Sequence, residues 1–219
     1  MLFSLLCGCT TGAAIPSLTA TTTRQNFGEV VKVIFQRRLD GATLNEFVIG
    51  TTDPKLKGSW TTLKAASDGT KAIFSPYTEG YEGAAGSAIK FGGTGQTTGG
   101  IQRVVGKEPT QVKGTFFGAW QSTIRELDGI SCEDLTVFLV NECGHIAGVS
   151  DDPTNPTTFK GFPIAIQSLF IADKTHGKQA EDDANAFEWT FKPNWSKYFT
   201  VLAPTDFNPV DDADLNTIA

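Results

Sequence analysis

Four cysteines and two histidines are among the side chains of this 219-residue chain that could bind a metal or attack a substrate. One residue separates Cys7 from Cys9, and Cys143 and His145 form a second pair with the same spacing. Zinc sites usually have two to four residues between paired ligands, so neither pair has the usual spacing. We therefore expect no metal and no cofactor, although a C-x-C…C-x-H zinc set stays open as an alternative. We interpret these cysteines and Cys132 as free, buried thiols in a reducing compartment.

The catalytic candidates lack the partners that catalysis needs. A nucleophilic Cys must lie beside an imidazole that a third group orients, and nothing in the spacing of His145 and His176 indicates this. The nucleophile elbow G-x-S-x-G is absent. The acidic pair in EGYE (79–82) lacks the apolar, aromatic neighbourhood that raises the pKa of one carboxyl above that of the other. We interpret the chain as non-enzymatic.

The segment GGTGQTTGG (92–100) is a candidate phosphate-binding loop. Phosphate binding needs such a loop between a strand and a helix, so that the N-terminus of the helix faces the anion. Here the strand-like run IQRVV follows, and no Gly-Lys-Ser/Thr is present. We therefore expect no nucleotide site.

The first residues contain LCGC (6–9), which resembles a bacterial lipidation motif. A secretory signal has a basic start and about 7–15 apolar residues. Here no Lys or Arg precedes Arg24, and the apolar run has six residues. We expect residues 1–26 to form an unprocessed arm whose apolar side chains pack on a core or on a neighbouring copy. These side chains are Leu2, Phe3, Leu5 and Leu6.

The net charge of −6 is unevenly distributed. Residues 151–219 contain 11 acidic and 5 basic residues, so residues 1–150 have 13 of each and are neutral. Binding of nucleic acid favours clustered Lys and Arg, so we expect no specific grip on DNA or RNA. The acidic loops either keep the protein soluble or repel nucleic acid. Their prominent carboxylates are Asp151, Asp152, Glu181, Asp182 and Asp183.

Short β-branched and aromatic runs separated by Gly, Pro and Asp dominate the chain, which predicts a mainly β fold. We expect a β-sandwich or barrel with one or two short helices, in a single domain over residues 27–203 followed by an acidic tail over 204–219. In two strands we expect alternate residues to share a face. The expected strands are 29–38, 45–50, 70–77, 101–107, 110–120, 159–175 and 186–203, with two more within 134–150 on either side of residues 141–144, and the expected helices are 60–66 and 121–129. The residues expected to share a face are Ile164, Ile166, Ser168, Phe170 and Ala172 in one strand, and Phe187, Trp189 and Phe191 in the other.

Residues 78–100 are very rich in Gly around the strand-like core SAIKF. Long segments of this kind inside a domain are either disordered or functional. We expect a projecting loop or hairpin that packs on a partner subunit. Its candidate contact residues are Tyr81, Ile89 and Phe91.

The chain resembles structural proteins of tailed-bacteriophage virions, of the tail-tube and neck-ring type. The resemblance rests on layout: the strand EVVKVIFQRR (29–38), the helix-bearing stretch 53–83, the helix STIRELDG (122–129), and the closing strands within 162–175 and 186–202. It implies homo-oligomers around a channel for DNA, other virion proteins as partners, synthesis in the host cytoplasm, no membrane association and no catalytic residues.

A tube that passes DNA without gripping it favours a lumen lined with carboxylates, because these repel phosphates at close range. We expect the pair Asp151 and Asp152, or the run 181–183, to line such a channel. The alternative is an exported β-sandwich lipoprotein that is lipidated at Cys9 and binds a glycan or surface partner through Trp189 and Trp195.

Overall fold

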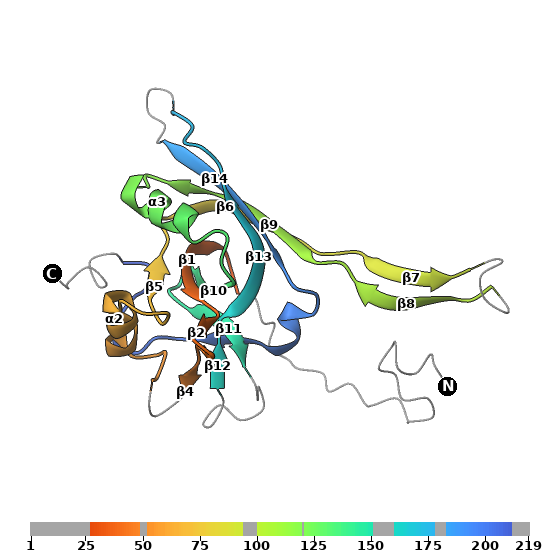
Figure 1. The fold of residues 1–219 in the computed structure, drawn as a ribbon, viewed down its shortest axis with the longest axis horizontal. Coiled ribbons are helices and arrows are strands. Elements are labelled where there is room, and N and C mark those ends of the chain that lie inside the picture. Colours follow the sequence, from red (N-terminus) through yellow and green to blue (C-terminus); the bar gives the residue numbers. More distant parts are fainter. Residues whose placement is uncertain are drawn as a thin grey trace.

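The computed structural model describes residues 27–48, 52–93, 100–119, 121–150, 160–177 and 183–211. Two short helices and many antiparallel strands make up these residues (Figure 1), which confirms the predicted mainly β fold. The elements are β1 (Val30–Arg37), β2 (Leu39–Asp40), β3 (Thr43–Leu44), β4 (Phe47–Val48), α2 (Lys57–Ala65), β5 (Ala72–Phe74), β6 (Thr78–Ala84), β7 (Ala88–Gly92), β8 (Gln102–Lys107), β9 (Thr110–Phe117), α3 (Gln121–Gly129), β10 (Leu135–Asn141), β11 (Ile146–Ser150), β12 (Lys160–Phe162), β13 (Ile164–Ile171), β14 (Ala184–Phe191), the 3-10 turn η1 (Trp195–Tyr198) and β15 (Phe199–Leu202).

One eleven-stranded sheet forms the body of the molecule. Its longest hydrogen-bonded path runs β4-β12-β11-β10-β13-β14-β9-β6, with β1, β5 and β15 joined to its sides. The sheet curls strongly, and β13 and β14 arch over the interior (Figure 1). Asp40-Gly41 turns the chain and closes only the small β2–β3 hairpin, because β4 pairs with β12 and not with β1.

β10 lies at the centre of this body. All seven of its residues are buried, and it pairs with β1, β11 and β13. Alternate side chains enter two different cores: Val137 and Leu139 join a large cluster, whereas Phe138 and Val140 join a small one. A strand that is covered on both faces has a continuous apolar sequence, and LTVFLV in β10 is such a sequence.

The small core is closed by α2 and by the chain after β15. Trp60 of α2 packs 4.8 Å from Phe47 and 5.2 Å from Phe138, measured between ring centroids. Lys57 at the start of α2 donates its backbone N–H to a carboxylate oxygen of Asp206, 2.7 Å away. This acceptor satisfies one of the N–H groups that a helix start leaves open, and Phe207 beside it is buried in the small core.

β13 changes faces in mid-strand. Ile164 and Ile166 are buried as expected, but Ser168 has a φ of +56° and the pairing with β14 shifts between Gln167 and Phe170. An extra residue inverts the alternation of a strand. Leu169 and Ile171 therefore point into the core, and the expectation that Ser168 and Phe170 share a face with Ile164 and Ile166 is wrong.

In β14 the expected alternation is confirmed, since Phe187, Trp189 and Phe191 are all buried. The Phe187 ring stacks on Trp189 at 4.7 Å and lies 4.3 Å from the ring of Phe116. Gly114 stands opposite Phe187 in the register, and a Cβ added there would lie 2.5 Å from the Cζ of Phe187. The aromatic stack therefore occupies the space where Gly114 has no side chain.

The β6–β9 pair continues beyond the body as the β7–β8 hairpin. Among the described strands β7 and β8 pair with each other alone, and the hairpin projects far from the sheet (Figure 1). At its root the N–H of Glu108 donates to the carbonyl of Ser87 over 2.9 Å. The structure thus has a projecting hairpin within the described residues 88–93 and 100–107, whereas Thr78–Ala84, the first part of the Gly-rich segment, forms β6 of the sheet.

Replacing Gly114 by Ala should destabilise the fold, because the Phe187 ring is held by Phe116 and Trp189 and has no room to move. We expect a loss of about 1–3 kcal/mol in the free energy of unfolding, the usual cost of overpacking. Denaturant unfolding monitored by tryptophan fluorescence measures it. Gly58→Ala in α2 is the matched control, since a Cβ there meets nothing within 4 Å and should be neutral or stabilising. Equal stability of the two variants would contradict this packing account.

Candidate functional site

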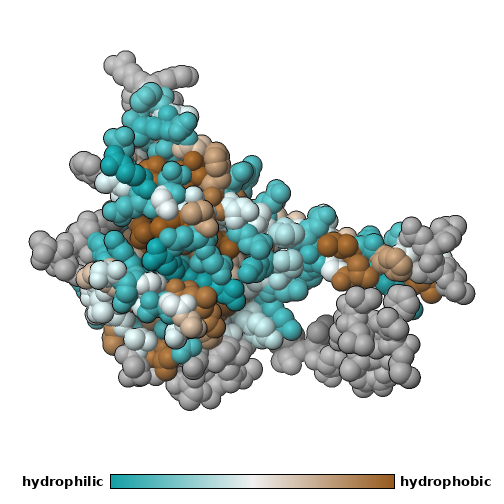
Figure 2. Space-filling view, viewed as in Figure 1, coloured by the Kyte–Doolittle hydropathy of each residue, from teal (hydrophilic) through white to brown (hydrophobic). Residues whose placement is uncertain are grey.

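The β7–β8 hairpin carries a concentration of exposed, large apolar side chains. Figure 2 shows apolar residues gathered along the projecting arm, away from the core of the molecule. Surface apolar residues are ordinary when they are scattered, but a contiguous group marks an interaction site. These side chains are between 38% and 59% exposed and are Ile89, Phe91, Ile101, Val104 and Val105.

The register of the hairpin places one of these side chains, Phe91, beside a cation. Ile89 and Phe91 are two residues apart on β7 and therefore lie on one face. Arg103 of β8 stands directly opposite Phe91, and Gly106 stands opposite Ile89. This face, Ile89 with Phe91 and Arg103, is called the docking face of the hairpin below.

A two-stranded hairpin on its own is only marginally stable in water. Among the described residues no third strand pairs with β7 or β8, and their large apolar side chains are exposed. Covering this hairpin with another surface would both bury apolar area and support the strand pairing. The arrangement is suited to binding a macromolecule and not to chemistry on a small one.

The charge of the hairpin is opposite to that of the rest of the chain. Residues 88–107 contain Lys90, Arg103 and Lys107 and no acidic residue, so their charge is +3. Removing these three from 18 basic residues leaves 15 against 24 acidic ones, a net charge of −9 for the remainder. The hairpin is thus a basic and apolar arm on an acidic body.

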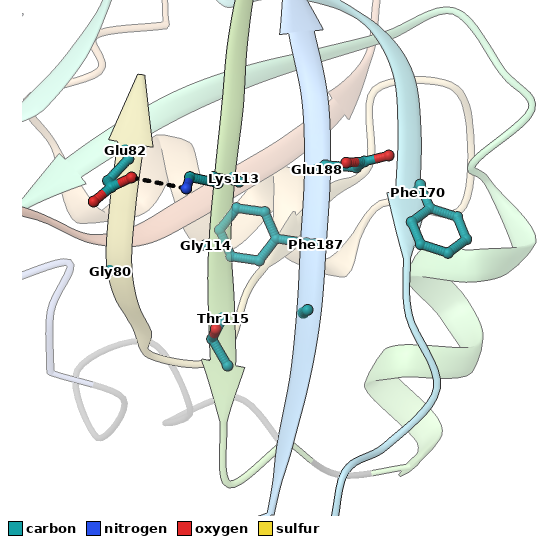
Figure 3. A pocket seen from close by; sticks show the side chains of 9 residues that line it. Gly80, Glu82, Lys113, Gly114, Thr115, Phe170, Phe187 and Glu188 are labelled. Atoms are coloured by element: carbon teal, nitrogen blue, oxygen red, sulfur yellow. Dashed lines mark ion pairs between the residues drawn. The ribbon is translucent and has the colours of Figure 1, made fainter. Parts of the chain in front are cut away.

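The solvent side of β6, β9, β14 and β13 forms a shallow hollow of about 390 Å³, shown in Figure 3. One row of side chains crosses all four strands: Glu82 pairs with Lys113 in the register, Lys113 with Glu188, and Glu188 with Phe170. The ammonium of Lys113 lies 3.1 Å from a carboxylate oxygen of Glu82. The Phe170 ring is 56% exposed at the end of this row.

A neighbouring row adds another carboxylate to this side of the sheet. Glu79 stands opposite Thr115, which is two residues from Lys113 on β9 and so shares its face. Three carboxylates and one ammonium give the surface a net charge of −2. We call this surface the outer face: Glu79, Glu82, Lys113, Thr115, Phe170, Ala186 and Glu188.

Of the acidic residues expected to line a channel, only Asp183 lies among the described residues, at the start of β14. Its carboxylate lies 3.3 Å from the ammonium of Lys174 and accepts the N–H of Gly177 over 3.3 Å. The hydrogen bond from Lys174, followed by that from Gly177, lowers the pKa of this carboxyl. The other candidates lie outside the described residues; they are the acidic Asp151, Asp152, Glu181 and Asp182 and the apolar Leu2, Phe3, Leu5 and Leu6.

Tyr81, the third expected contact residue of the Gly-rich segment, sits in a different environment from Ile89 and Phe91. Its ring lies 6.0 Å from that of Trp189 and packs against the large core. Burial raises the pKa of its hydroxyl, which has no hydrogen-bond partner among the described residues. Ile89 and Phe91 are the two that lie exposed on the projecting hairpin.

The two described cysteines, Cys132 and Cys143, are exposed, so the expectation of buried thiols is wrong for them. The turn that carries Cys143 and His145 is held by Asn141, whose side-chain oxygen accepts the backbone N–H of both residues, over 3.1 and 2.7 Å. Within the described residues, no group of three or more His, Cys, Asp or Glu side chains could hold a metal ion.

The glycan-binding alternative needs Trp189 and Trp195 at the surface, and only one of them is accessible. Trp189 is 1% exposed and cannot contact a ligand. Trp195 is half-buried, stacks on Phe191 at 4.5 Å and donates its Nε1–H to the Thr110 hydroxyl. Neither described helix is long and apolar enough to cross a membrane.

Lys174→Met should raise the pKa of the Asp183 carboxyl toward its ordinary value, because the largest cause of the shift is removed. The carboxyl resonance of Asp183 followed by NMR titration measures this pKa directly. His176→Gln is the control, since His176 makes the weakest of the contributions that lower the pKa and should change it least. An unchanged pKa in Lys174→Met would contradict the arrangement.

No protein-family model and no curated protein matches the chain. Two solved structures share features of its fold. The first is described as the tail of an empty GTA particle with C6 symmetry; it has a TM-score of 0.30 and 10% identity, over 58% of this chain and 82% of that one. The second is the tube-terminating cap of the anti-feeding prophage, with a TM-score of 0.31 and 8% identity over 84% of this chain and 96% of that one. At TM-scores this low the similarity carries no conclusion about function.

Proposed function

We propose that the chain is a structural subunit of a tailed-bacteriophage virion, of the tail-tube or neck-ring type, which assembles with copies of itself around a channel for DNA. The observation that carries the proposal is the β7–β8 hairpin, which projects from the sheet and exposes large apolar side chains. The assignment to a virion comes from the layout of the sequence, which resembles that of tail-tube and neck-ring proteins.

Self-association explains the exposed hairpin without a second kind of protein, because each copy supplies both a basic arm and an acidic body. Contacts between two different surfaces of identical chains are heterologous, and they produce rings when the rotation closes and helical tubes when it does not. Both products are suitable for a channel. The exposed apolar side chains of the hairpin would then be covered in the assembly.

The channel part of the proposal rests on the acidic residues of the last third of the chain. Their net charge of −6 over residues 151–219 would repel DNA phosphates and prevent a tight grip. We propose that Asp151 and Asp152, or Glu181 to Asp183, line the lumen. Placement of these side chains on the outer wall of an assembled particle would contradict this part alone.

Removing the hairpin is the direct test of assembly. The bond between Ser87 and Glu108 brings the two cut ends together, so residues 88–107 can be replaced by Asn-Gly without disturbing β6 or β9. Deleting 80–98 would be a poorer choice, because it removes most of β6 and the packing of Tyr81. We expect electron microscopy to show rings or tubes for the intact chain and monomers for the trimmed one.

Val201→Ser is the matched control, since it removes an exposed apolar side chain (43% exposed) from the body and should leave assembly intact. Thermal unfolding of the trimmed chain should resemble that of the intact monomer, because the large core is untouched. Two results would refute the proposal: an intact chain that remains monomeric at high concentration, or a trimmed chain that still polymerises.

A further inference from the structure

We propose that the docking face of the hairpin in one copy binds the outer face of a second copy. The inference rests on the proposed self-association and names the acceptor surface that the hairpin would use. Each partner of this contact comes from described residues: Ile89, Phe91 and Arg103 on the arm, and the row containing Glu188 and Phe170 on the body.

Charge complementarity supports this pairing. The hairpin has a charge of +3 and no carboxylate between residues 88 and 107, and the outer face has a net charge of −2. On the outer face Lys113 already lies 3.1 Å from Glu82. Figure 3 shows the Glu188 carboxylate on the opposite side of its strand, directed toward Phe170. An incoming guanidinium can bind such a carboxylate with two parallel hydrogen bonds.

The apolar side chains are complementary as well. Phe170 is 56% exposed, and the bulge at Ser168 is the reason that it faces solvent. On the neighbouring strand β14 the outer face carries the small residue Ala186, and Gly80 on β6 lines the same hollow of about 390 Å³ at its other edge. Phe91 stands opposite Arg103, so a hairpin that places its guanidinium on Glu188 brings an aromatic ring close to Phe170. Aromatic pairs of this kind are favourable beyond their buried area.

The direction of the hairpin means that the outer face it binds must belong to a second copy of the chain. The hairpin continues the β6–β9 pair in a direction away from the body (Figure 1), so it cannot fold back onto the outer face of its own chain without breaking that pair. Residues on the arm therefore meet the outer face of another molecule. Such a contact leaves the second hairpin available for a third copy, as a ring or tube needs.

The hollow between α3 and β13 is a poorer acceptor. Its charged residues are balanced, since Arg125 and Lys174 accompany Asp128 and Asp173. A basic arm gains less from a neutral surface than from one with excess carboxylates. The outer face therefore fits the hairpin better.

Charge reversal tests the contact. Arg103→Glu and Glu188→Lys should each raise the concentration needed for half-assembly by about tenfold or more, because a like-charge pair replaces an attractive one. The double variant should restore assembly toward that of the intact chain. Sedimentation velocity across a concentration series measures all four proteins.

Two further variants keep the test independent of folding. Phe170→Ser should also weaken assembly without lowering the thermal midpoint of the monomer, because its ring is exposed. Glu126→Lys reverses an exposed charge on α3 and should assemble like the intact chain. If Arg103→Glu weakens assembly but Glu188→Lys and Phe170→Ser do not, the acceptor lies elsewhere and the self-association proposal survives. If the intact chain never assembles, both proposals fail.

Discussion

The double burial of β10 is the constraint on which the rest of the molecule depends. Since both faces of this strand are covered, the sheet must curl to supply one core through β13, β14 and β9, and must recruit α2 and the chain around Phe207 to supply the other. The curl brings β6 to the far end of the sheet path. There it pairs with β9 along its length, and the two strands leave the body together as the stem of the β7–β8 hairpin.

This division gives the molecule a rigid body and an exposed arm whose physical properties are opposite. The body buries an aromatic stack of Phe116, Phe187 and Trp189. The arm displays its apolar side chains and carries only positive charge over residues 88–107. Two features distinguish the described surface. One is the hairpin, whose apolar side chains are exposed, and the other is the acidic outer face of the sheet with its exposed Phe170.

Local patterns in the sequence predicted the elements well, because strand alternation and Gly density are local properties. The buried face of β14, the helices near 60–66 and 121–129, and the projecting Gly-rich segment could all be recognised. The face switch in β13 could not, because the positive φ of Ser168 is imposed by pairing with β14 and has no signature in the residue type. The sequence patterns did not predict the outer face, for a related reason. Glu82, Lys113, Phe170 and Glu188 are far apart in the chain, and only the register of four strands brings them into one row.

Amide hydrogen exchange at increasing protein concentration tests the central claim, that the hairpin is buried by other copies of the chain, most directly. The account predicts that exchange in residues 88–93 and 100–107 slows as concentration rises, while exchange in β10 stays slow and unchanged. Fast exchange in the hairpin at every concentration would contradict it, because an arm covered by a neighbour cannot remain open to solvent.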